Sequence, residues 1–177
     1  MGSAADLGHP EARAELIGKG EALAVALAKR DCLLLTGATT GIVYLVGKAA
    51  HDAGTFHVGV SPGASESEHI EHYKLPVDAC DAIIYTGFGL KGRNVVLVRS
   101  CDIVLFIAGA MGSLNEFTIA HDEGKVIGCL TRTGGVADEA DYVVEKFGKR
   151  SAARVFKNTD PEQLIEQCMN AFLEKDV

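Results

Sequence analysis

The sequence lacks the basic stretches and the long apolar runs that contacts with nucleic acids and membranes require. Acidic residues outnumber basic ones by 24 to 17, the net charge is −7, and no run of basic residues offers a local exception. A nucleic-acid partner is therefore not expected. The longest apolar runs, such as residues 103–110, are far shorter than the roughly 20 residues that span a bilayer, so we expect no membrane contact.

Paired cysteines and a signal peptide are also missing. The cysteines are odd in number and widely spaced, with no Cys-x-x-Cys pair: Cys32, Cys80, Cys101, Cys129 and Cys168. This usage predicts reduced, buried thiols in a cytoplasmic protein. No metal site is predicted, because His69 and His72 lie among acidic residues typical of a solvated loop. His51, His57 and His121 fall at element ends and are interpreted as surface or capping residues.

Standard nucleotide fingerprints are absent as well. The Gly-containing segment GATTGIVYLVGK, which starts at Gly37, does not end in Gly-Lys-Ser/Thr as a P-loop does. It does not fit G-x-G-x-x-G either. These two absences make ATP hydrolysis and dinucleotide binding less favoured functions.

What the sequence does contain is a regular alternation of short apolar runs and helical patterns. It predicts strands at 31–35, 56–60, 82–86, 103–107, 126–130 and 155–157, and helices at 11–29, 42–53, 91–100, 113–123, from about 138 to 148, and after an Asp160 N-cap. Residues 65–75 are interpreted as an exposed loop or lid. The alternation predicts one α/β domain over residues 1–177, with a Rossmann-like, doubly wound, mainly parallel sheet and helices on both faces.

In such a sheet ligands bind beyond the carboxyl ends of the strands. The predicted strands end in loops of small residues, which gives these candidate ligand or phosphate contacts: Gly37, Thr39, Thr40, Gly41, Pro62, Gly63, Thr86, Gly87, Gly89, Gly109, Ala110, Met111, Gly112 and Ser113. The hydroxyls of Thr39, Thr40 and Ser113 lie beside helix starts, where they suit a phosphate. They also suit helix caps, and both roles can hold together.

The segment RNVVLVRSCDIVLFIAGAMGSLNE, from Arg93 to Glu116, resembles the LOG superfamily, whose members were formerly called lysine decarboxylases. The family pattern, an arginine followed by A-D and P-G-G-x-G-T-x-x-E, is matched without a gap at Arg93, Asp102, Gly109, Gly112, Ser113 and Glu116. The upstream segments TGATTG and VGVSPG are similar to other family motifs. TGFG followed by RNVVLVRSCD resembles the subgroup that includes the molybdenum cofactor carrier protein.

The resemblance implies that Arg93 and Glu116 act as a catalytic pair on a nucleoside 5′-monophosphate. Cleavage of its N-glycosidic bond would release free base and ribose 5-phosphate. Glu116 could stabilise the oxocarbenium-like sugar and orient water, and Arg93 could hold the carboxylate and the phosphate. Such a phosphoribohydrolase requires no cofactor. The alternative from the residues themselves is a structural ion pair at two helix starts.

The carrier subgroup keeps this pair while it binds a pterin cofactor, so retention of the pair does not establish turnover. A second hypothesis is therefore a carrier or sensor, without catalysis, of a nucleotide or a molybdopterin-type ligand. Hydrolysis is narrowly favoured. The partners implied are a small phosphorylated ligand and further copies of the chain, in a homodimer or a larger homo-oligomer.

Several positions depart from the family pattern. Ala38, Thr39 and Thr40 replace glycines, and Ala108 replaces a proline or glycine, so methyl groups are expected to narrow the room for a phosphate. The family's first strand, which ends in Gly-Ser, is apparently missing because the chain starts Met1-Gly2-Ser3. Either the start is shortened or neighbouring strands close the gap.

Overall fold

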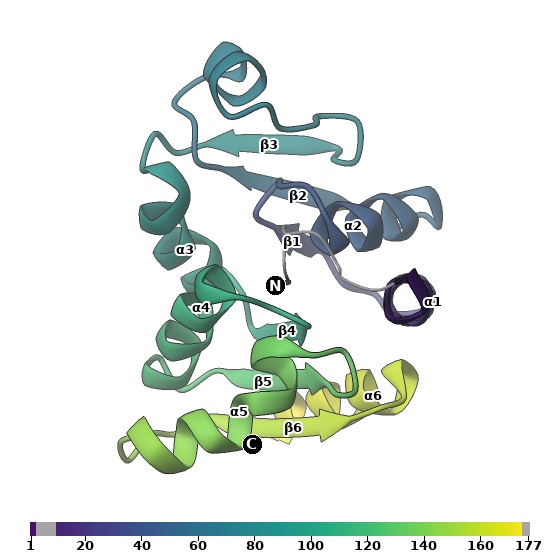
Figure 1. Ribbon diagram of the computed structural model, residues 1–177, viewed down its shortest axis with the longest axis vertical. Helices are drawn as coiled ribbons and strands as arrows, with labels where there is room; N and C mark the ends of the chain where they lie inside the picture. The colour runs from purple at the N-terminus through teal and green to yellow at the C-terminus, as the bar shows by residue number, and fades with distance from the viewer. Residues whose placement is uncertain (3–9, 175–177) are drawn as a thin grey trace. The chain divides into compact units, whose positions relative to one another are not determined.

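The computed structural model describes residues 1–2 and 10–174 and separates into two compact units (Figure 1). One unit contains described residues 10–97, and the other contains 98–174 together with Met1 and Gly2. Each unit contains a three-stranded parallel sheet and its helices. The predicted α/β, Rossmann-like class is confirmed, with the strands in two sheets of three. A single domain over the whole chain stays a prediction.

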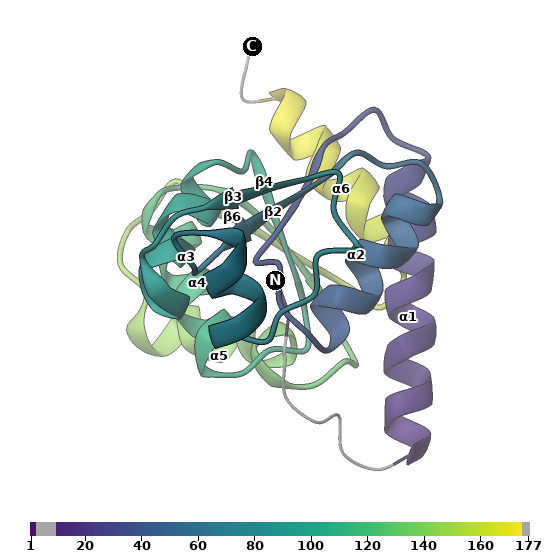
Figure 2. The same ribbon diagram turned by 90° about the horizontal axis from the view of Figure 1, so that it is seen from above.

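The unit of residues 10–97 has the strand order β1-β2-β3, with Leu34 paired to His57 and Val58 paired to Ala82. Its elements are α1 (Pro10–Ala28), β1 (Leu34–Thr36), α2 (Ile42–Asp52), β2 (His57–Ser61), η1 (Glu68–His72), β3 (Ala82–Tyr85) and the start of α3 (Gly89–Arg99). Helices α1 and α2 lie side by side, as Figure 2 shows. The buried leucines of α1, among them Leu16 and Leu23, form the predicted apolar stripe.

The other unit has the order β4-β5-β6 and carries helices on both faces of its sheet. Its elements are β4 (Ile103–Ile107), α4 (Met111–Asp122), β5 (Val126–Leu130), α5 (Gly135–Phe147), β6 (Arg154–Asn158) and α6 (Pro161–Leu173). Strand β5 is buried throughout, and its side chains alternate in direction. Ile127 and Cys129 pack in one core cluster with Phe117 of α4, whereas a β-carbon at Gly128 would meet Cys168 of α6.

Met1 and Gly2 lie along β4. The amino group of Met1 donates to the Leu105 carbonyl at 2.6 Å, and the Ile107 N–H donates to the Met1 carbonyl at 3.1 Å. Gly2 forms a single parallel bridge with Ile107. Within the described ranges 1–2 and 10–174 no strand precedes β1, and Gly2 gives β4 a short parallel neighbour at Ile107. The missing first strand stays a prediction.

Element boundaries differ from the predicted ones mainly where loops contain glycine or alanine. Strand β1 begins three residues later than expected, α4 begins at Met111 instead of Ser113, and α5 begins at Gly135 instead of about residue 138. Small residues start these helices without a capping side chain, so the sequence carried no cap to mark them. The predicted cap of α6 is confirmed, since Asp160 Oδ1 accepts from the Gln163 N–H at 2.9 Å.

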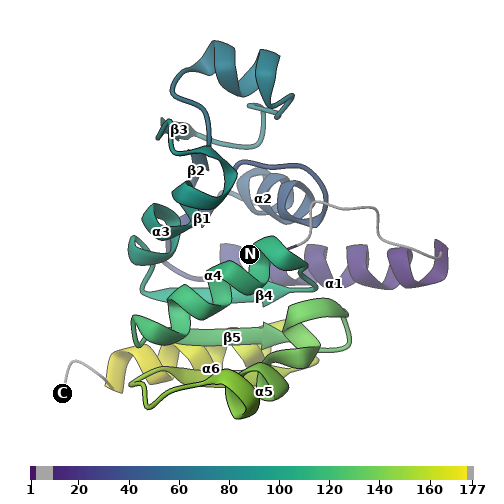
Figure 3. The ribbon, with the colours of Figure 1, turned by 60° about the vertical axis from the view of Figure 1, so that its left-hand side comes forward.

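The interpretation of residues 65–75 as an exposed loop is wrong for their central part. This part forms the helical turn η1, drawn as the short helix beside β3 in Figure 3. Ser65 Oγ accepts from the Glu68 N–H at 3.2 Å, and Glu68 Oε2 accepts from the Ala64 N–H at 2.7 Å. His69 is fully buried. The Ser-x-x-Glu spacing, typical of a helix start, was the available signal.

None of the described helices combines the length and the apolarity that a bilayer crossing needs.

Candidate functional site

The loop after β1 lies on the side chain of Arg93. Gly37 is buried, and a β-carbon added there would lie 2.2 Å from Arg93 Nη2. Arg93, on α3, is 5% exposed, and its Nη1 donates to Asn94 Oδ1 at 2.6 Å. The structure thus brings a predicted catalytic residue together with a predicted loop residue. A side chain at residue 37 would have to displace the guanidinium, which occupies its space.

Farther along this loop the predicted contacts become accessible. Thr39 is partly exposed and Thr40 is exposed, and α2 begins directly after Gly41, which has a φ of 72°. No side chain caps the α2 N-terminus within the described part of the chain. Ala38 has a φ of 48°, and its methyl group is buried over β2, where a β-carbon at Gly59 would lie 2.8 Å from it. This methyl group therefore packs against the sheet.

Hydrogen bonds join the loop after β2 to the loop after β3. The Gly87 N–H donates to the Gly63 carbonyl at 2.9 Å, and the Gly89 N–H donates to the Pro62 carbonyl at 3.0 Å. Thr86 Oγ1 donates to the carbonyl of Ser61, the last residue of β2, at 2.7 Å. These predicted contacts are therefore neighbours: Pro62, Gly63, Thr86, Gly87 and Gly89.

The loop after β4 leads into α4 through strained and small residues. Ala108 has a φ of 53° and Gly109 a φ of 114°, and the Gly109 carbonyl accepts from the Val136 N–H at 3.0 Å. A β-carbon at Gly109 would lie 2.8 Å from Ser113 Cβ. Ala110 and Met111 are exposed, and Ala110, as the N-cap residue, gives α4 no side-chain hydrogen bond.

Ser113 and Glu116 are both buried on α4, three residues apart and hence on one face of the helix. Ser113 Oγ donates to the Gly2 carbonyl at 3.0 Å. The hydroxyl proton therefore has an acceptor within the protein, and a contact of this hydroxyl with phosphate stays a prediction. The backbone N–H of Ser113 lies in the first turn of α4, where helices have N–H groups without intrahelical partners.

Glu116 and Arg93 belong to different compact units. Both are buried, at 6% and 5% exposure. Their action as a pair stays a prediction.

Sequence reasoning missed two buried histidines that support these loops. His57 is 1% exposed and His69 is fully buried, so the interpretations of His57 as a surface or capping residue and of His69 as part of a solvated loop are wrong. The His57 ring fits because Gly47 on α2 leaves room for it: a β-carbon there would lie 2.5 Å from Cε1. His121 is 8% exposed, so its interpretation as a surface residue is wrong as well. For His57 the available signal in the sequence was Gly47, a glycine in the middle of α2.

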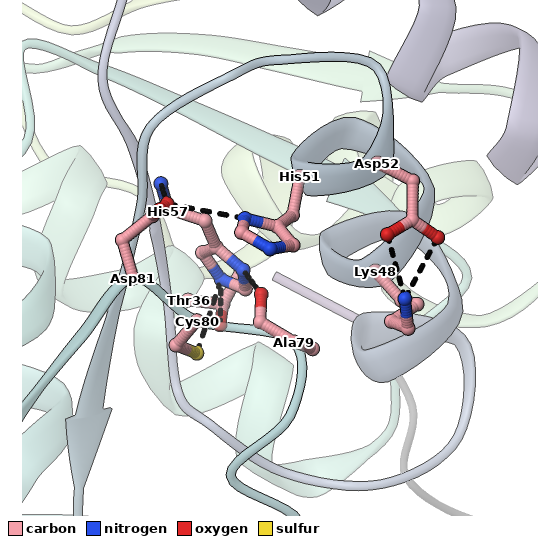
Figure 4. A network of polar contacts seen from close by, with 8 residues as sticks. All are labelled: Thr36, Lys48, His51, Asp52, His57, Ala79, Cys80 and Asp81. Atoms are coloured by element: carbon pink, nitrogen blue, oxygen red, sulfur yellow. Dashed lines mark hydrogen bonds and ion pairs between the residues drawn. The ribbon is translucent and has the colours of Figure 1, made fainter.

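Figure 4 shows the polar contacts around His57. Its Nε2 lies 2.8 Å from Thr36 Oγ1, and its Nδ1 contacts the Ala79 carbonyl. Burial lowers the pKa of His57. Asp81 Oδ2 accepts from the His57 backbone N–H at 2.8 Å, and this bond lowers the pKa of Asp81. Burial raises the pKa of Cys80, whose Sγ lies 3.8 Å from His57 Nε2, to about 11.

The cysteines are all free thiols, as predicted, but only Cys129 and Cys168 are fully buried. The prediction of burial is wrong for Cys32, Cys80 and Cys101, which are partly exposed. Burial raises the pKa of Cys129 and that of Cys168 to about 12, so neither is a reactive thiolate near neutral pH. In the described residues no group of three or more histidine, cysteine or acidic side chains is arranged to hold a metal ion.

Several solved structures are similar to this chain. The X-ray structure of TM1055 is 25% identical, with a TM-score of 0.77, and the match covers 94% of this chain and 96% of that one. The molybdenum cofactor binding protein from the phototrophic bacterium Rippkaea orientalis is 23% identical, with a TM-score of 0.75 and coverages of 97% and 93%. The molybdenum cofactor carrier protein from Chlamydomonas reinhardtii is 21% identical, with a TM-score of 0.73 and coverages of 98% and 96%.

At these identities the two molybdenum cofactor proteins share the fold with this chain. The family itself is given by the sequence. The profile of the SLOG cluster4 family matches residues 1–165, which agrees with the resemblance to the LOG superfamily, and the chain therefore belongs to the SLOG cluster4 family.

Proposed function

We propose that the protein binds the phosphate of a nucleotide-like or pterin-type small molecule, with the N-terminus of α4 as the principal anion contact. The observation that carries this proposal is the way α4 begins. Its N-cap residue, Ala110, offers no side-chain hydrogen bond, whereas α6 has its N-cap carboxylate at Asp160. The first N–H groups of α4 are therefore left for an external acceptor.

The surroundings of this helix start suit an anion. Ala110 and Met111 are exposed, and Gly109 and Gly112 add no side chain that would keep a ligand from the backbone. The helix dipole adds a positive partial charge at the same place. In the unit of residues 10–97, α2 also begins without a side-chain cap, after Gly41, and is a separate candidate anion contact.

The comparisons support the class of ligand. Two of the similar structures are a molybdenum cofactor binding protein and a molybdenum cofactor carrier protein. Binding without turnover is the function we favour, because Arg93 is held in the interior against Gly37 and Ser113 Oγ is bonded to the Gly2 carbonyl. Both side chains therefore make contacts within the protein itself.

Hydrolysis of a nucleoside 5′-monophosphate is the second candidate. It is favoured by Glu116, which lies one turn after Ser113 on the same helix and matches the family's glutamate. In this reaction water would add to the sugar carbon, the N-glycosidic bond would break, and the base would leave with the electron pair. Arg93 would orient the carboxylate or the phosphate.

The binding test removes one backbone donor and leaves the helix intact. Met111 is the first residue of α4, where proline is well tolerated and lacks only the N–H. The extended conformation of Ala110, at φ −114° and ψ −155°, also suits a residue before proline. Met111→Pro should weaken binding of AMP, GMP or a phosphorylated pterin about tenfold or more in calorimetric titrations. Met111→Ala, which keeps the N–H, is the matched control.

Equal affinity of Met111→Pro and Met111→Ala would contradict the proposed contact. Turnover is tested separately, by incubation of the protein with a panel of nucleoside 5′-monophosphates and chromatography of the free base. Base release that is lost in Glu116→Gln would establish the hydrolase and overturn binding without turnover. Absence of release, with thermal stabilisation by a nucleotide or pterin, would support the carrier.

Two further expectations accompany this proposal. A cytoplasmic location stays a prediction, and so does a homodimer or larger homo-oligomer. Light scattering coupled to size-exclusion chromatography, with and without ligand, would determine the oligomer.

A further inference from the structure

We propose that His57 and His69 are positioning residues, each of which holds one ligand loop in shape through a single hydroxyl group. His57 acts through Thr36 on the loop of residues 37–41, and His69 acts through Ser61 on the loop of residues 62–63. The inference rests on the proposed function, because it assumes that these loops contact the ligand.

The first pair begins at the end of β1. The Ala38 N–H donates to Thr36 Oγ1 at 3.2 Å, which closes a turn at the start of the loop. The same Oγ1 lies 2.8 Å from His57 Nε2. Because His57 Nδ1 contacts the Ala79 carbonyl, which can only accept, Nδ1 carries the proton and Nε2 accepts from the hydroxyl. Thr36 Oγ1 thus accepts from the Ala38 N–H and donates to His57 Nε2.

The second pair repeats this arrangement at the end of β2. The Gly63 N–H donates to Ser61 Oγ at 3.0 Å, and Ser61 Oγ lies 2.8 Å from His69 Nδ1. His69 Nε2 lies 3.1 Å from the Pro76 carbonyl, so here Nε2 carries the proton and Nδ1 accepts. The two imidazoles come from different elements and use opposite nitrogens, yet they meet the loops in the same way.

The first loop needs such support because Ala38 has an unfavoured backbone conformation, and the second loop is tightly packed at Gly63. Ala38 has a φ of 48°, which an alanine adopts only where its surroundings hold it. Gly63 is pressed against η1, since a β-carbon there would lie 3.0 Å from the His69 backbone nitrogen. A hydroxyl that accepts the loop N–H is oriented only if its own proton has an acceptor, and a neutral buried imidazole provides one.

Burial lowers the pKa of His57, which favours the neutral form of its ring. His57 faces the Cys80 thiol, and His51 and Asp81 lie beyond it, with His51 Nδ1 3.2 Å from Asp81 Oδ2 (Figure 4). Asp81 accepts from the backbone N–H of His57, and its charge partly opposes the lowering of the ring's pKa that burial causes. His69 packs edge-on against the Tyr85 ring, with 6.0 Å between centroids.

The test measures the rate of backbone amide hydrogen exchange in each loop, by mass spectrometry of the full chain without ligand. Thr36→Val should raise exchange about tenfold in the peptide that covers residues 37–41 and leave residues 62–63 unchanged. Ser61→Ala should give the reverse. Thr36→Ser and Ser61→Thr keep the hydroxyl and should restore protection. Leu23→Ala destabilises the same unit through the buried side chain of α1 and is the control for a general effect.

The second measurement is the affinity for AMP and for a phosphorylated pterin. Thr36→Val and His57→Gln should lower it several-fold, and Thr36→Ser should restore it. Exchange in Thr36→Val that matches Leu23→Ala in both loops would overturn the positioning role. A wild-type protein that binds neither probe would overturn the proposed function, while the exchange pattern would still decide whether the histidines position the loops.

Discussion

The guanidinium of Arg93 lies directly against the backbone of Gly37, so that a β-carbon on residue 37 would be 2.2 Å from Nη2 and 2.5 Å from Cζ. Gly37→Ala should therefore displace a buried arginine, because no side chain approaches a β-carbon this closely. We expect a loss of about 1–3 kcal/mol in the free energy of unfolding, measured by urea denaturation. Unchanged stability would mean that Arg93 leaves this position at no cost.

At Gly18 the same substitution should have the opposite effect on stability. A β-carbon there would have no atom within 4 Å, and the residue lies in the middle of α1. Gly18→Ala should raise the free energy of unfolding by about 0.5–1 kcal/mol, because alanine loses less backbone entropy in a helix. The same urea titration measures it. A loss of stability would show that α1 has another neighbour at this point.

Asp160 carries the N-cap bond of α6, and the Pro161 that follows takes the first helical position. Asp160→Ala should cost about 1 kcal/mol of stability, since the Gln163 N–H loses its acceptor. Asp160→Asn keeps an acceptor oxygen and should cost much less. Thermal unfolding of the three proteins side by side gives the comparison, and equal losses in both variants would contradict a capping role.

His57 predicts a pH dependence of stability. Burial lowers its pKa below the ordinary histidine value of 6.5, which the unfolded chain retains. As the pH falls below about 6.5, the unfolded chain takes up a proton that the folded protein resists, so the free energy of unfolding decreases. At higher pH both states are neutral and this loss is absent. His57→Gln should therefore show a flatter stability profile between about pH 7.5 and about pH 5.5 than the wild type.

The control for this profile is His72→Gln, a substitution at an exposed histidine outside the two histidine–hydroxyl pairs. A wild-type curve that coincides with that of His57→Gln over the same range would contradict the expected contribution of His57.

Sequence reasoning reached the strands and most helices because their patterns are local. Apolar runs such as the one at β5, and the Asp160 cap before Pro161, need no tertiary information to be recognised. The start of α4 at Met111 was missed for the opposite reason: it carries no cap, and this absence is what makes it a candidate anion site. Local pattern and function conflict there, as they often do at sites.

The histidines illustrate a second limit. His57 is adjacent to a polar turn in the sequence, and its burial depends on the space above Gly47 on α2 and on a hydroxyl that comes from β1. Such a contact between residues 21 positions apart has no local signature. The contact of Arg93 with Gly37 is of the same kind, since the motif around Arg93 predicts a role for the arginine and says nothing of its neighbour.

The opposite protonation of the two buried rings has a practical consequence. In His57 the proton is on Nδ1, and in His69 it is on Nε2, as the Ala79 and Pro76 carbonyls require. The ring nitrogens of the two residues should therefore give distinct chemical shifts in a nitrogen-labelled sample, with the pattern of one tautomer each. A ligand that disturbs only one loop would change the nitrogen chemical shifts of one histidine alone. Each loop therefore has its own NMR reporter within the protein.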